Sequence, residues 1–337
     1  MFIDQQTPAE DIKKLLQNIG FFNTENEYIT KVTKPGEGNM NVVLRIETNV
    51  RSFVLKQSRP FVQKYKTIEA PIERIDVEYR FYTTIANNAL LNKHFPKILN
   101  YNTEHHLLIL EDLGQCEDLS SLYKSDKMAI EQLELLVNIV AHIHNSEATK
   151  DYPKNKELRE LNYQHIFELP FMEHNDFCLN DVQPGLEALS IPYKKDELLK
   201  ERIKVIGRKY LSDGTTLLHG DYYPGSWMTK NDHIYIIDPE FSFLGFPEFD
   251  LGVFAAHSIL ISQNKNALFS IEKIYPYNID KELLAQITGI EIMRRLIGLA
   301  QLPLSLSLKE KESLLQLAYN LIMNPSNYTT TKNEWLT

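Results

Sequence analysis

The chain has 337 residues, of which 43% are hydrophobic and 24% are charged, and its formal net charge is −9 at pH 7. This composition is typical of a soluble protein, and the length allows two domains or one two-lobed unit. The negative charge argues against a nucleic-acid-binding surface, which requires a basic face. No apolar run reaches the roughly 18 residues of a membrane span, and the polar N-terminus does not resemble a signal peptide. We therefore expect neither nucleic acid nor membrane as a partner.

The two cysteines, Cys116 and Cys178, lie far apart in the sequence and have no metal-binding pattern around them. They are most simply free thiols in a reducing compartment, so we expect a cytoplasmic protein. The sequence leaves the oligomeric state open, and a homodimer is one option.

The N-terminal third begins with a helix and continues as strands. Ile12, Leu15, Leu16 and Ile19 form one apolar stripe, and Gly20 ends the helical pattern. Three strands are then expected, near residues 27–34, 41–48 and 51–57.

A glycine-containing turn, Gly36-Glu37-Gly38-Asn39, lies between the first two of these strands. Glycines at such a turn allow backbone amides to approach phosphate groups closely. We therefore take Gly36, Gly38 and Asn39 as candidate nucleotide-binding residues. The pattern is weak in isolation, because a plain hairpin turn has the same composition.

Lys56 ends the third strand, in the sequence Phe53-Val54-Leu55-Lys56. A single lysine in a strand is usually a solvated edge residue. In kinases, however, a lysine at this place holds the α- and β-phosphates of ATP and pairs with a glutamate from the next helix. That helix is expected within residues 70–86, where Glu78 lies near the apolar face. We assign the pair to Lys56 and Glu78, with Asp76 as the alternative partner.

The middle of the chain changes from strand to helix. The continuous apolar run at 107–110 predicts a buried strand, which leads into a loop after residue 110. From residue 118 the pattern is mostly helical, with a long amphipathic helix from Ile130 to His144. His142 and His144 face different sides of this helix, so we interpret both as structural residues and not as metal ligands.

Two acidic sites follow two short apolar strands in the last third of the chain. Asp221 comes after the run at 216–218, and Asp238-Pro239-Glu240 comes after the run at 234–237. Phosphoryl transfer requires this chemistry, because one carboxylate orients the nucleophile while another holds Mg²⁺. Asp221 fits the first role. Asp238 and Glu240 fit the second, since two residues in an extended segment can point the same way. An Asp after a strand is, by itself, equally well explained as a turn cap.

The ordered motifs HGDYYPGSWM, IIDPEF and FDLG resemble the catalytic core of the aminoglycoside phosphotransferase and choline kinase superfamily, relatives of the protein kinases. The DPEF form resembles the 5-methylthioribose kinases most. The resemblance extends from Gly36 to about Ala300. It implies an α+β, protein-kinase-like two-lobed fold, with a small antiparallel-sheet lobe at residues 1–112 and a larger, mainly helical lobe at 113–337.

The resemblance also implies roles for individual residues. Backbone groups of Glu111 and Leu113 would bind the adenine edge, and Asp250 of FDLG would brace the catalytic loop. The position five residues after Asp221 is usually an asparagine that binds metal, and here it is Ser226. Because a hydroxyl is a poorer ligand, the second metal position would depend more on Glu240 than on Ser226.

Arg294 and Arg295 are adjacent in the mostly apolar helical stretch 289–300. A buried guanidinium needs a partner, so pairing with acidic neighbours or exposure of the charged heads is the structural explanation. The stretch resembles the methylthioribose kinase segment whose paired arginines bind the sugar. We therefore expect Arg294 and Arg295, together with Asp221, to bind the substrate.

These observations predict an ATP-dependent small-molecule kinase that uses Mg²⁺ as cofactor and a small hydroxyl compound as substrate. The nearest substrate is 5-methylthioribose, phosphorylated at its anomeric hydroxyl. The prediction requires the carboxylates of Asp221, Asp238 and Glu240 to meet in one cleft with the amine of Lys56.

Two alternatives remain. An aminoglycoside, choline or other amino-alcohol phosphotransferase would need an acidic cleft for its cationic substrate, which the paired arginines oppose. A non-catalytic, nucleotide-binding pseudokinase or scaffold is favoured by Ser226, whereas the presence of Asp221, Asp238 and Lys56 argues against it.

Overall fold

The computed structural model describes residues 1–22, 26–36, 40–125 and 128–330 and divides the chain into two compact units. The first unit comprises Met1–Glu117 and Thr229–Ser242, and the second comprises Asp118–Met228 and Phe243–Thr337. The predicted boundary between residues 112 and 113 differs from this division. The first unit continues to Glu117, and a later segment returns to it because β11 (His233–Ile236) packs on α3 (Leu91–His94).

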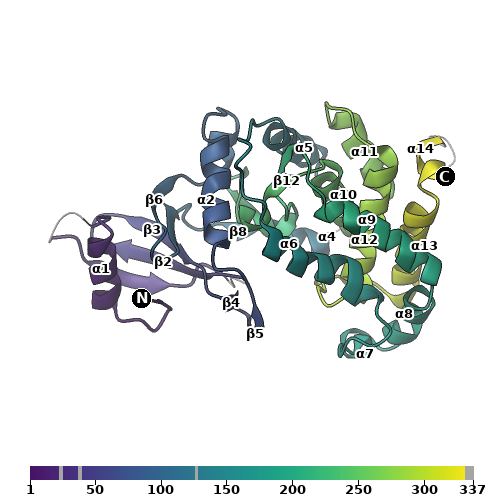
Figure 1. The fold of residues 1–337 in the computed structure, drawn as a ribbon, viewed down its shortest axis with the longest axis horizontal. Coiled ribbons are helices and arrows are strands. Elements are labelled where there is room, and N and C mark those ends of the chain that lie inside the picture. Colours follow the sequence, from purple (N-terminus) through teal and green to yellow (C-terminus); the bar gives the residue numbers. More distant parts are fainter. Residues whose placement is uncertain (23–25, 37–39, 126–127, 331–337) are drawn as a thin grey trace. The chain divides into compact units, whose positions relative to one another are not determined.

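A five-stranded antiparallel sheet forms the centre of the first unit (Figure 1). Its strand order is β1-β2-β3-β7-β6, and each neighbouring pair is antiparallel. The predicted strands of this region are confirmed to within a few residues. The bounds are β1 Ile29–Thr33, β2 Val42–Thr48, β3 Ser52–Gln57, β6 Ile98–Asn102 and β7 Leu107–Glu111, and a separate hairpin has β4 Phe61–Val62 and β5 Tyr65–Glu69.

The two faces of this sheet pack against different helices. On one face, Phe53 and Leu55 of β3 share an apolar core with Leu16 of α1 (Ala9–Asn18). Successive side chains of a strand point to opposite faces, so Lys56 points to the other face, where it meets α2 (Arg74–Ile85). Figure 1 shows α1 and α2 on the two sides of the sheet. The strand therefore directs a charged side chain away from the core and toward a helix.

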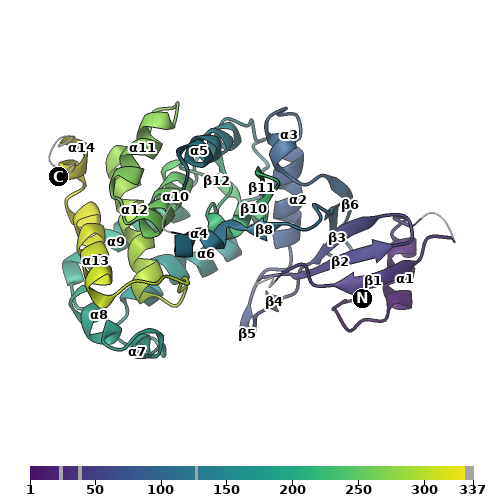
Figure 2. The same cartoon turned by 180° about the vertical axis from the view of Figure 1, so that it is seen from behind.

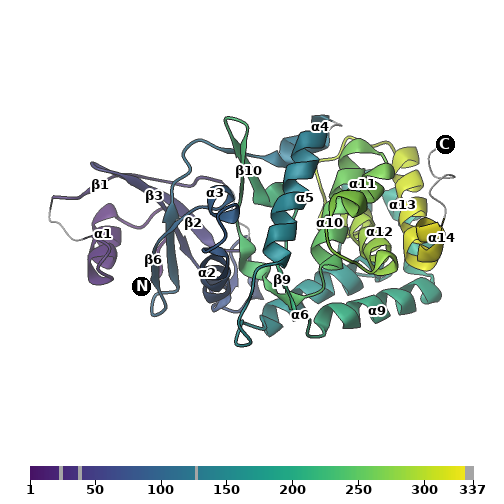
Figure 3. The ribbon, with the colours of Figure 1, turned by 90° about the horizontal axis from the view of Figure 1, so that it is seen from above.

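The second unit is mainly helical, as predicted. Helices α10, α12 and α13 lie side by side in it (Figure 2 and Figure 3). Helix α10 is buried over nearly its whole length, so each polar side chain that it carries needs a partner. The strands β9 (Thr216–Leu218) and β12 (Phe243–Gly245) form a small antiparallel pair. The helix bounds are α4 Leu122–Ser125, α5 Ile130–His144, α6 Lys156–Tyr163, α7 Leu179–Val182, α8 Leu186–Lys194, α9 Glu197–Leu211, α10 Glu248–Ser262, α11 Asn266–Ile274, α12 Lys281–Ile297, α13 Leu308–Met323 and α14 Pro325–Thr330.

Shorter elements connect these parts. The π-helical turn Gln164–Glu168 follows α6, and two further short strands are β8 (Glu117–Asp118) and β10 (Trp227–Lys230). Both cysteines lie in the described part of the chain and are free thiols, as predicted. Within the same residues, no helix combines the length and the apolar character that crossing a lipid bilayer requires.

Candidate active site

Lys56 and Glu78 form a buried ion pair in the first unit. Lys56 Nζ lies 2.7 Å from Glu78 Oε1, and the two residues are 5% and 0% exposed. The predicted pairing is confirmed, because Asp76 instead accepts a hydrogen bond from the Tyr101 hydroxyl at 2.5 Å. Asp238 also contacts Lys56 Nζ, so one ammonium group faces two carboxylates.

This arrangement keeps the lysine charged. Burial opposes the charge of Lys56, but Asp238 and Glu78 outweigh it, and the pKa of the ammonium group lies well above its ordinary value. Burial raises the pKa of Glu78, and the nearby Lys56 acts against that rise. The positive charge of Lys56 is therefore maintained at neutral pH, as phosphate binding requires.

Asp238 and Glu240 lie two residues apart but in different surroundings. Asp238 has a left-handed backbone, with φ 62° and ψ 49°, and Pro239–Phe241 form a short 3-10 turn. The predicted extended segment is therefore wrong, and the two side chains do not share one environment. The side chain of Asp238 is 43% exposed, whereas that of Glu240 is 9% exposed. A left-handed backbone at a residue other than glycine is strained, and such strain is concentrated at functional sites.

Two residues that the sequence analysis did not identify hold Glu240. Asn41 Nδ2 donates a hydrogen bond to Glu240 Oε2 at 2.8 Å, and Arg74 Nε lies 3.5 Å from the same oxygen. Arg74 is 1% exposed, and its terminal nitrogens donate to three backbone carbonyls at 2.6 to 2.7 Å. Burial raises the pKa of Glu240 to about 8, although Arg74 opposes the rise. The guanidinium of Arg74 thus ties the start of α2 to the turn that carries Glu240.

The carboxylates of this site suit Mg²⁺ only if a bound nucleotide and water supply further oxygen atoms. Among the described residues, no group of three or more His, Cys, Asp or Glu side chains could hold a metal ion. Mg²⁺ commonly takes one or two protein carboxylates and completes its shell with phosphate and water oxygens. The exposed carboxylate of Asp238 fits that requirement. Ser226 belongs to the second unit and is 2% exposed, and its role as a ligand stays a prediction.

The other predicted nucleotide residues lie in the first unit. The Glu111 amide donates to the Lys97 carbonyl at 2.8 Å, and the Leu113 carbonyl accepts from Lys230 Nζ at 2.6 Å. Adenine binding by the backbone of Glu111 and Leu113 stays a prediction. Gly36 is exposed in the turn after β1. Gly38 and Asn39 lie outside the described residues.

Asp221 follows β9 in a loop that Asp250 braces. The fully buried carboxylate of Asp250 accepts hydrogen bonds from the backbone amides of His219 at 2.7 Å and Gly220 at 2.9 Å. Gly220 has φ +84°, a conformation that favours glycine. His144 Nε2 lies 3.2 Å from the same carboxylate. The prediction that Asp250 braces the loop is confirmed, and His144 adds a further contact to this carboxylate.

Arg294 and Arg295 share one carboxylate, that of Glu291, on the preceding turn of α12. Arg294 donates to its two oxygens at 3.1 and 3.0 Å, and Arg295 Nε donates at 2.6 Å. Pairing with an acidic neighbour, the structural explanation, therefore holds for both arginines. Burial favours a neutral Glu291, but the two guanidinium groups outweigh it and keep the pKa of this carboxyl well below its ordinary value.

Each arginine also has a feature beyond that pair. Arg294 Nε is buried and has no hydrogen-bond partner among the residues that the structure describes. The guanidinium carbon of Arg295 lies 5.0 Å from the centre of the Tyr223 ring, two residues after Asp221. Substrate binding by the two arginines stays a prediction.

Tyr123 and His257 extend this cluster, and the sequence analysis missed both. The Tyr123 hydroxyl lies 2.5 Å from His257 Nδ1, and His257 Nε2 lies 3.1 Å from Glu291 Oε1. Tyr223, two residues after Asp221, lies beside Arg295, so the loop that carries Asp221 approaches the same cluster. His257 stands in the apolar helical stretch after residue 250, and that contrast could have identified it. Nothing in the sequence distinguishes Tyr123 from the other tyrosines.

The π-helical turn before residue 169 also packs on α12. Burial, together with the charge of Arg294, lowers the pKa of His165 in this turn. Short π-helical segments occur frequently at functional sites. The turn therefore brings another polar side chain, that of His165, near Arg294.

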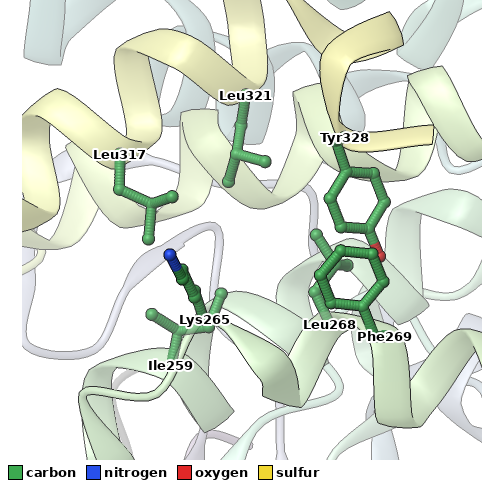
Figure 4. Close-up of a pocket in the computed structure, with 7 residues that line it drawn as sticks. All are labelled: Ile259, Lys265, Leu268, Phe269, Leu317, Leu321 and Tyr328. Carbon is green, nitrogen blue, oxygen red and sulfur yellow. The ribbon is translucent and has the colours of Figure 1, made fainter. Parts of the chain in front are cut away.

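A small pocket in the second unit lies elsewhere. Its volume is about 10 Å³, which is sufficient for no more than one water molecule. Figure 4 shows that mostly apolar side chains surround it, and none of the predicted site residues is among them. The lining residues are Ile259, Lys265, Leu268, Phe269, Leu317, Leu321 and Tyr328.

Known proteins agree with this architecture. A choline kinase from Streptococcus pneumoniae superimposes with a TM-score of 0.51 at 14% identity, covering 93% of this chain and 99% of that one. A spectinomycin phosphotransferase in complex with ADP and spectinomycin gives a TM-score of 0.51 at 12% identity, covering 96% and 99%. At these identities the likeness concerns the fold alone, and it confirms the predicted kinase-like fold.

Relatives in sequence are more specific. The methylthioribose kinase of Geobacillus sp. (strain WCH70) is 27% identical, over 88% of this chain and 87% of that protein. The methylthioribose kinase of Exiguobacterium sibiricum is 25% identical over 75% of this chain, and the match spans just under two thirds, 66%, of that protein. Residues 31–268 match the model of the phosphotransferase enzyme family, which is more than half of the chain. The chain therefore belongs to the phosphotransferase enzyme family.

Proposed function

We propose that the protein is an ATP-dependent kinase that phosphorylates a hydroxyl group of a small molecule, with 5-methylthioribose as the acceptor. The observation that carries the proposal is the buried Lys56 ammonium group, which contacts both Glu78 and Asp238. A lysine kept charged in this way suits phosphate binding, and the exposed carboxylate beside it suits Mg²⁺.

The first unit would bind the nucleotide. When bound, ATP supplies the phosphoryl group and Mg²⁺ neutralises its charge. Asp238 would ligate the metal because its carboxylate is exposed, whereas the position of Glu240 against Asn41 and Arg74 supports a role in fixing that turn. The nucleotide-binding residues would be Gly36, Gly38, Asn39, Lys56, Glu78, Glu111 and Leu113.

Asp221 would act on the acceptor. It would take the proton of the acceptor hydroxyl while that oxygen bonds to the γ-phosphorus and the bond to ADP breaks. The hydrogen bonds from the loop backbone to Asp250 hold the peptide before Asp221 in place. A carboxylate that is already positioned pays little ordering entropy during the reaction.

The charge near Asp221 supports a neutral acceptor. Arg294 and Arg295 share the single carboxylate of Glu291, so this cluster carries two positive charges and one negative charge. With the carboxylate of Asp221 the charges balance, so a cationic acceptor such as choline would find no excess of negative charge there, whereas guanidinium groups bind hydroxyl oxygens well. The names of the sequence relatives point to the same acceptor.

The test is coupled ADP release with Mg-ATP across methylthioribose, choline and spectinomycin. We expect turnover of methylthioribose and little turnover of the two cationic compounds. Turnover of one of these compounds and not of methylthioribose would contradict the acceptor assignment, but the assignment as a kinase would still hold. Binding of Mg-ATP without turnover of any acceptor would support the scaffold alternative.

A further inference from the structure

A buried chain of polar side chains crosses three helices of the second unit and ends on Arg295. Tyr123 lies on α4, His257 on α10 and Glu291 on α12. The relative exposure of these three residues is 2%, 0% and 1%. The two contacts that join them are 2.5 and 3.1 Å long.

The direction of the hydrogen bonds follows from the partners. A carboxylate that pairs with two arginines can only accept, so His257 Nε2 carries the hydrogen and donates to Glu291 Oε1. A neutral imidazole has one N–H, which leaves Nδ1 to accept from the Tyr123 hydroxyl. Burial lowers the pKa of His257 to about 4, in agreement with the neutral form. All donors thus point from Tyr123 toward Glu291.

The same chain sets the position of Arg295. Glu291 Oε1, which accepts from His257, also accepts from Arg295 Nε at 2.6 Å. The guanidinium of Arg295 lies over the Tyr223 ring, and the centre of that ring lies 5.1 Å from the centre of the His257 ring. A shift of His257 would therefore move both the carboxylate and the aromatic ring that hold the arginine.

We propose that Tyr123 and His257 are positioning residues for acceptor specificity. They hold Glu291, and through it Arg295, in one place near Asp221, so that a neutral polyhydroxyl acceptor binds and a cationic acceptor is rejected. This inference rests on the proposed kinase function. If the two residues had only a structural role, their substitution would lower stability. It would not change the KM of the acceptor separately from kcat and from the KM of ATP.

The most conservative test is Tyr123→Phe, which removes one hydroxyl group in the full-length protein. We expect the KM for methylthioribose to rise about tenfold, the loss expected for one hydrogen bond, while kcat and the KM for ATP change by less than about twofold. Preference for methylthioribose over choline, measured as the ratio of kcat/KM values, falls by the same factor. Tyr277→Phe, at an exposed tyrosine, is the matched control and leaves all values unchanged.

Two variants of His257 test the donor itself. His257→Leu removes both hydrogen bonds and raises the KM for methylthioribose at least as much as Tyr123→Phe. His257→Gln retains an N–H that can reach Glu291, and we expect it to restore most of the acceptor binding. His174→Leu, at an exposed histidine, controls for the substitution.

The outcomes separate this inference from the function on which it rests. Turnover of methylthioribose by the natural chain, with an unchanged acceptor KM in Tyr123→Phe and His257→Leu, would overturn the inference and leave the function. Equal changes in the KM values of ATP and acceptor would also overturn it, because they indicate general loss of structure. No turnover by the natural chain with any acceptor would overturn both.

Discussion

Two buried glutamates, Glu240 in the first unit and Glu291 in the second, have pKa values that are shifted in opposite directions. Burial raises the pKa of Glu240 to about 8. Burial acts on Glu291 in the same sense, yet two arginines hold its pKa well below the ordinary value. The difference lies in the partners. Glu240 has one arginine nitrogen at 3.5 Å, whereas Glu291 accepts hydrogen bonds from two guanidinium groups at 2.6 to 3.1 Å.

The comparison shows how two clusters of similar residues suit opposite ligands. In the first unit, the two carboxylates of Glu78 and Asp238 face the single ammonium group of Lys56, so a further cation such as Mg²⁺ can balance the charge. In the second unit, arginines outnumber their carboxylate, so the cluster suits neutral or anionic oxygen groups. The first cluster consists of Lys56, Arg74, Glu78, Asp238 and Glu240, and the second of Glu291, Arg294 and Arg295.

Removing the central cation of the first cluster should have the largest effect. Lys56→Met eliminates the charge between Glu78 and Asp238, and we expect kcat/KM for ATP to fall about 10³-fold, as for loss of a charge-stabilising donor. The measurement is steady-state kinetics at saturating acceptor. Lys66→Met, at an exposed lysine of β5, should change nothing, and full activity of Lys56→Met would contradict the nucleotide assignment.

Removing the shared carboxylate of the second cluster should destabilise the protein. Glu291→Gln leaves two guanidinium groups without their counter-ion, and we expect the free energy of unfolding to fall by about 3 kcal/mol. Urea denaturation at pH 7 measures this loss. Glu282→Gln, at an exposed position of the same helix, serves as control. An equal stability for Glu291→Gln and the natural chain would show that the ion pairs between Glu291 and the two arginines contribute little to stability.

The neutral His257 should make the protein sensitive to acid. Burial lowers the pKa of His257 from its ordinary 6.5 to about 4. Between these values the unfolded chain binds more protons than the folded one, so stability is full above pH 6.5 and is lost as the pH falls toward 4. His257→Leu should flatten the decline of Tm between pH 6.5 and 5. An unchanged decline would assign the acid sensitivity to other groups.

The smallest effect is expected at Glu240. Because burial raises the pKa of this carboxyl to about 8, most molecules carry it neutral at pH 7, and glutamine preserves its shape and its acceptor for Asn41. We expect Glu240→Gln to change the free energy of unfolding by less than about 1 kcal/mol, near the net value of one hydrogen bond. A loss as large as that of Glu291→Gln would remove the contrast between the two glutamates.

The local sequence pattern was sufficient to predict part of the candidate site. The kinase pattern of a strand lysine that pairs with a glutamate of the next helix, together with the place of Glu78 near the apolar face of its helix, was sufficient to predict the pair with Lys56. The turn at Asp238 did not follow, because an extended reading of Asp238 and Glu240 overlooked Pro239 and the left-handed backbone before it.

Contacts between segments that lie far apart in the sequence could not be predicted either. Arg74 meets Glu240 across 166 positions of sequence (240 minus 74), and Tyr123 meets His257 across 134. Only tertiary packing brings such pairs together, and no local periodicity of the sequence indicates which distant residues will meet. The return of residues 229–242 to the first unit escaped prediction for the same reason.

The central claim is that this chain transfers a phosphoryl group with Asp221 as the base, and the variant Asp221→Asn tests it most directly. Affinity for Mg-ATP and turnover of methylthioribose are measured on the same preparation, beside Asp181→Asn at an exposed position. The account predicts an unchanged Kd for Mg-ATP and a kcat reduced by about 10²- to 10⁴-fold in Asp221→Asn only. A kcat equal to that of the natural chain would contradict it.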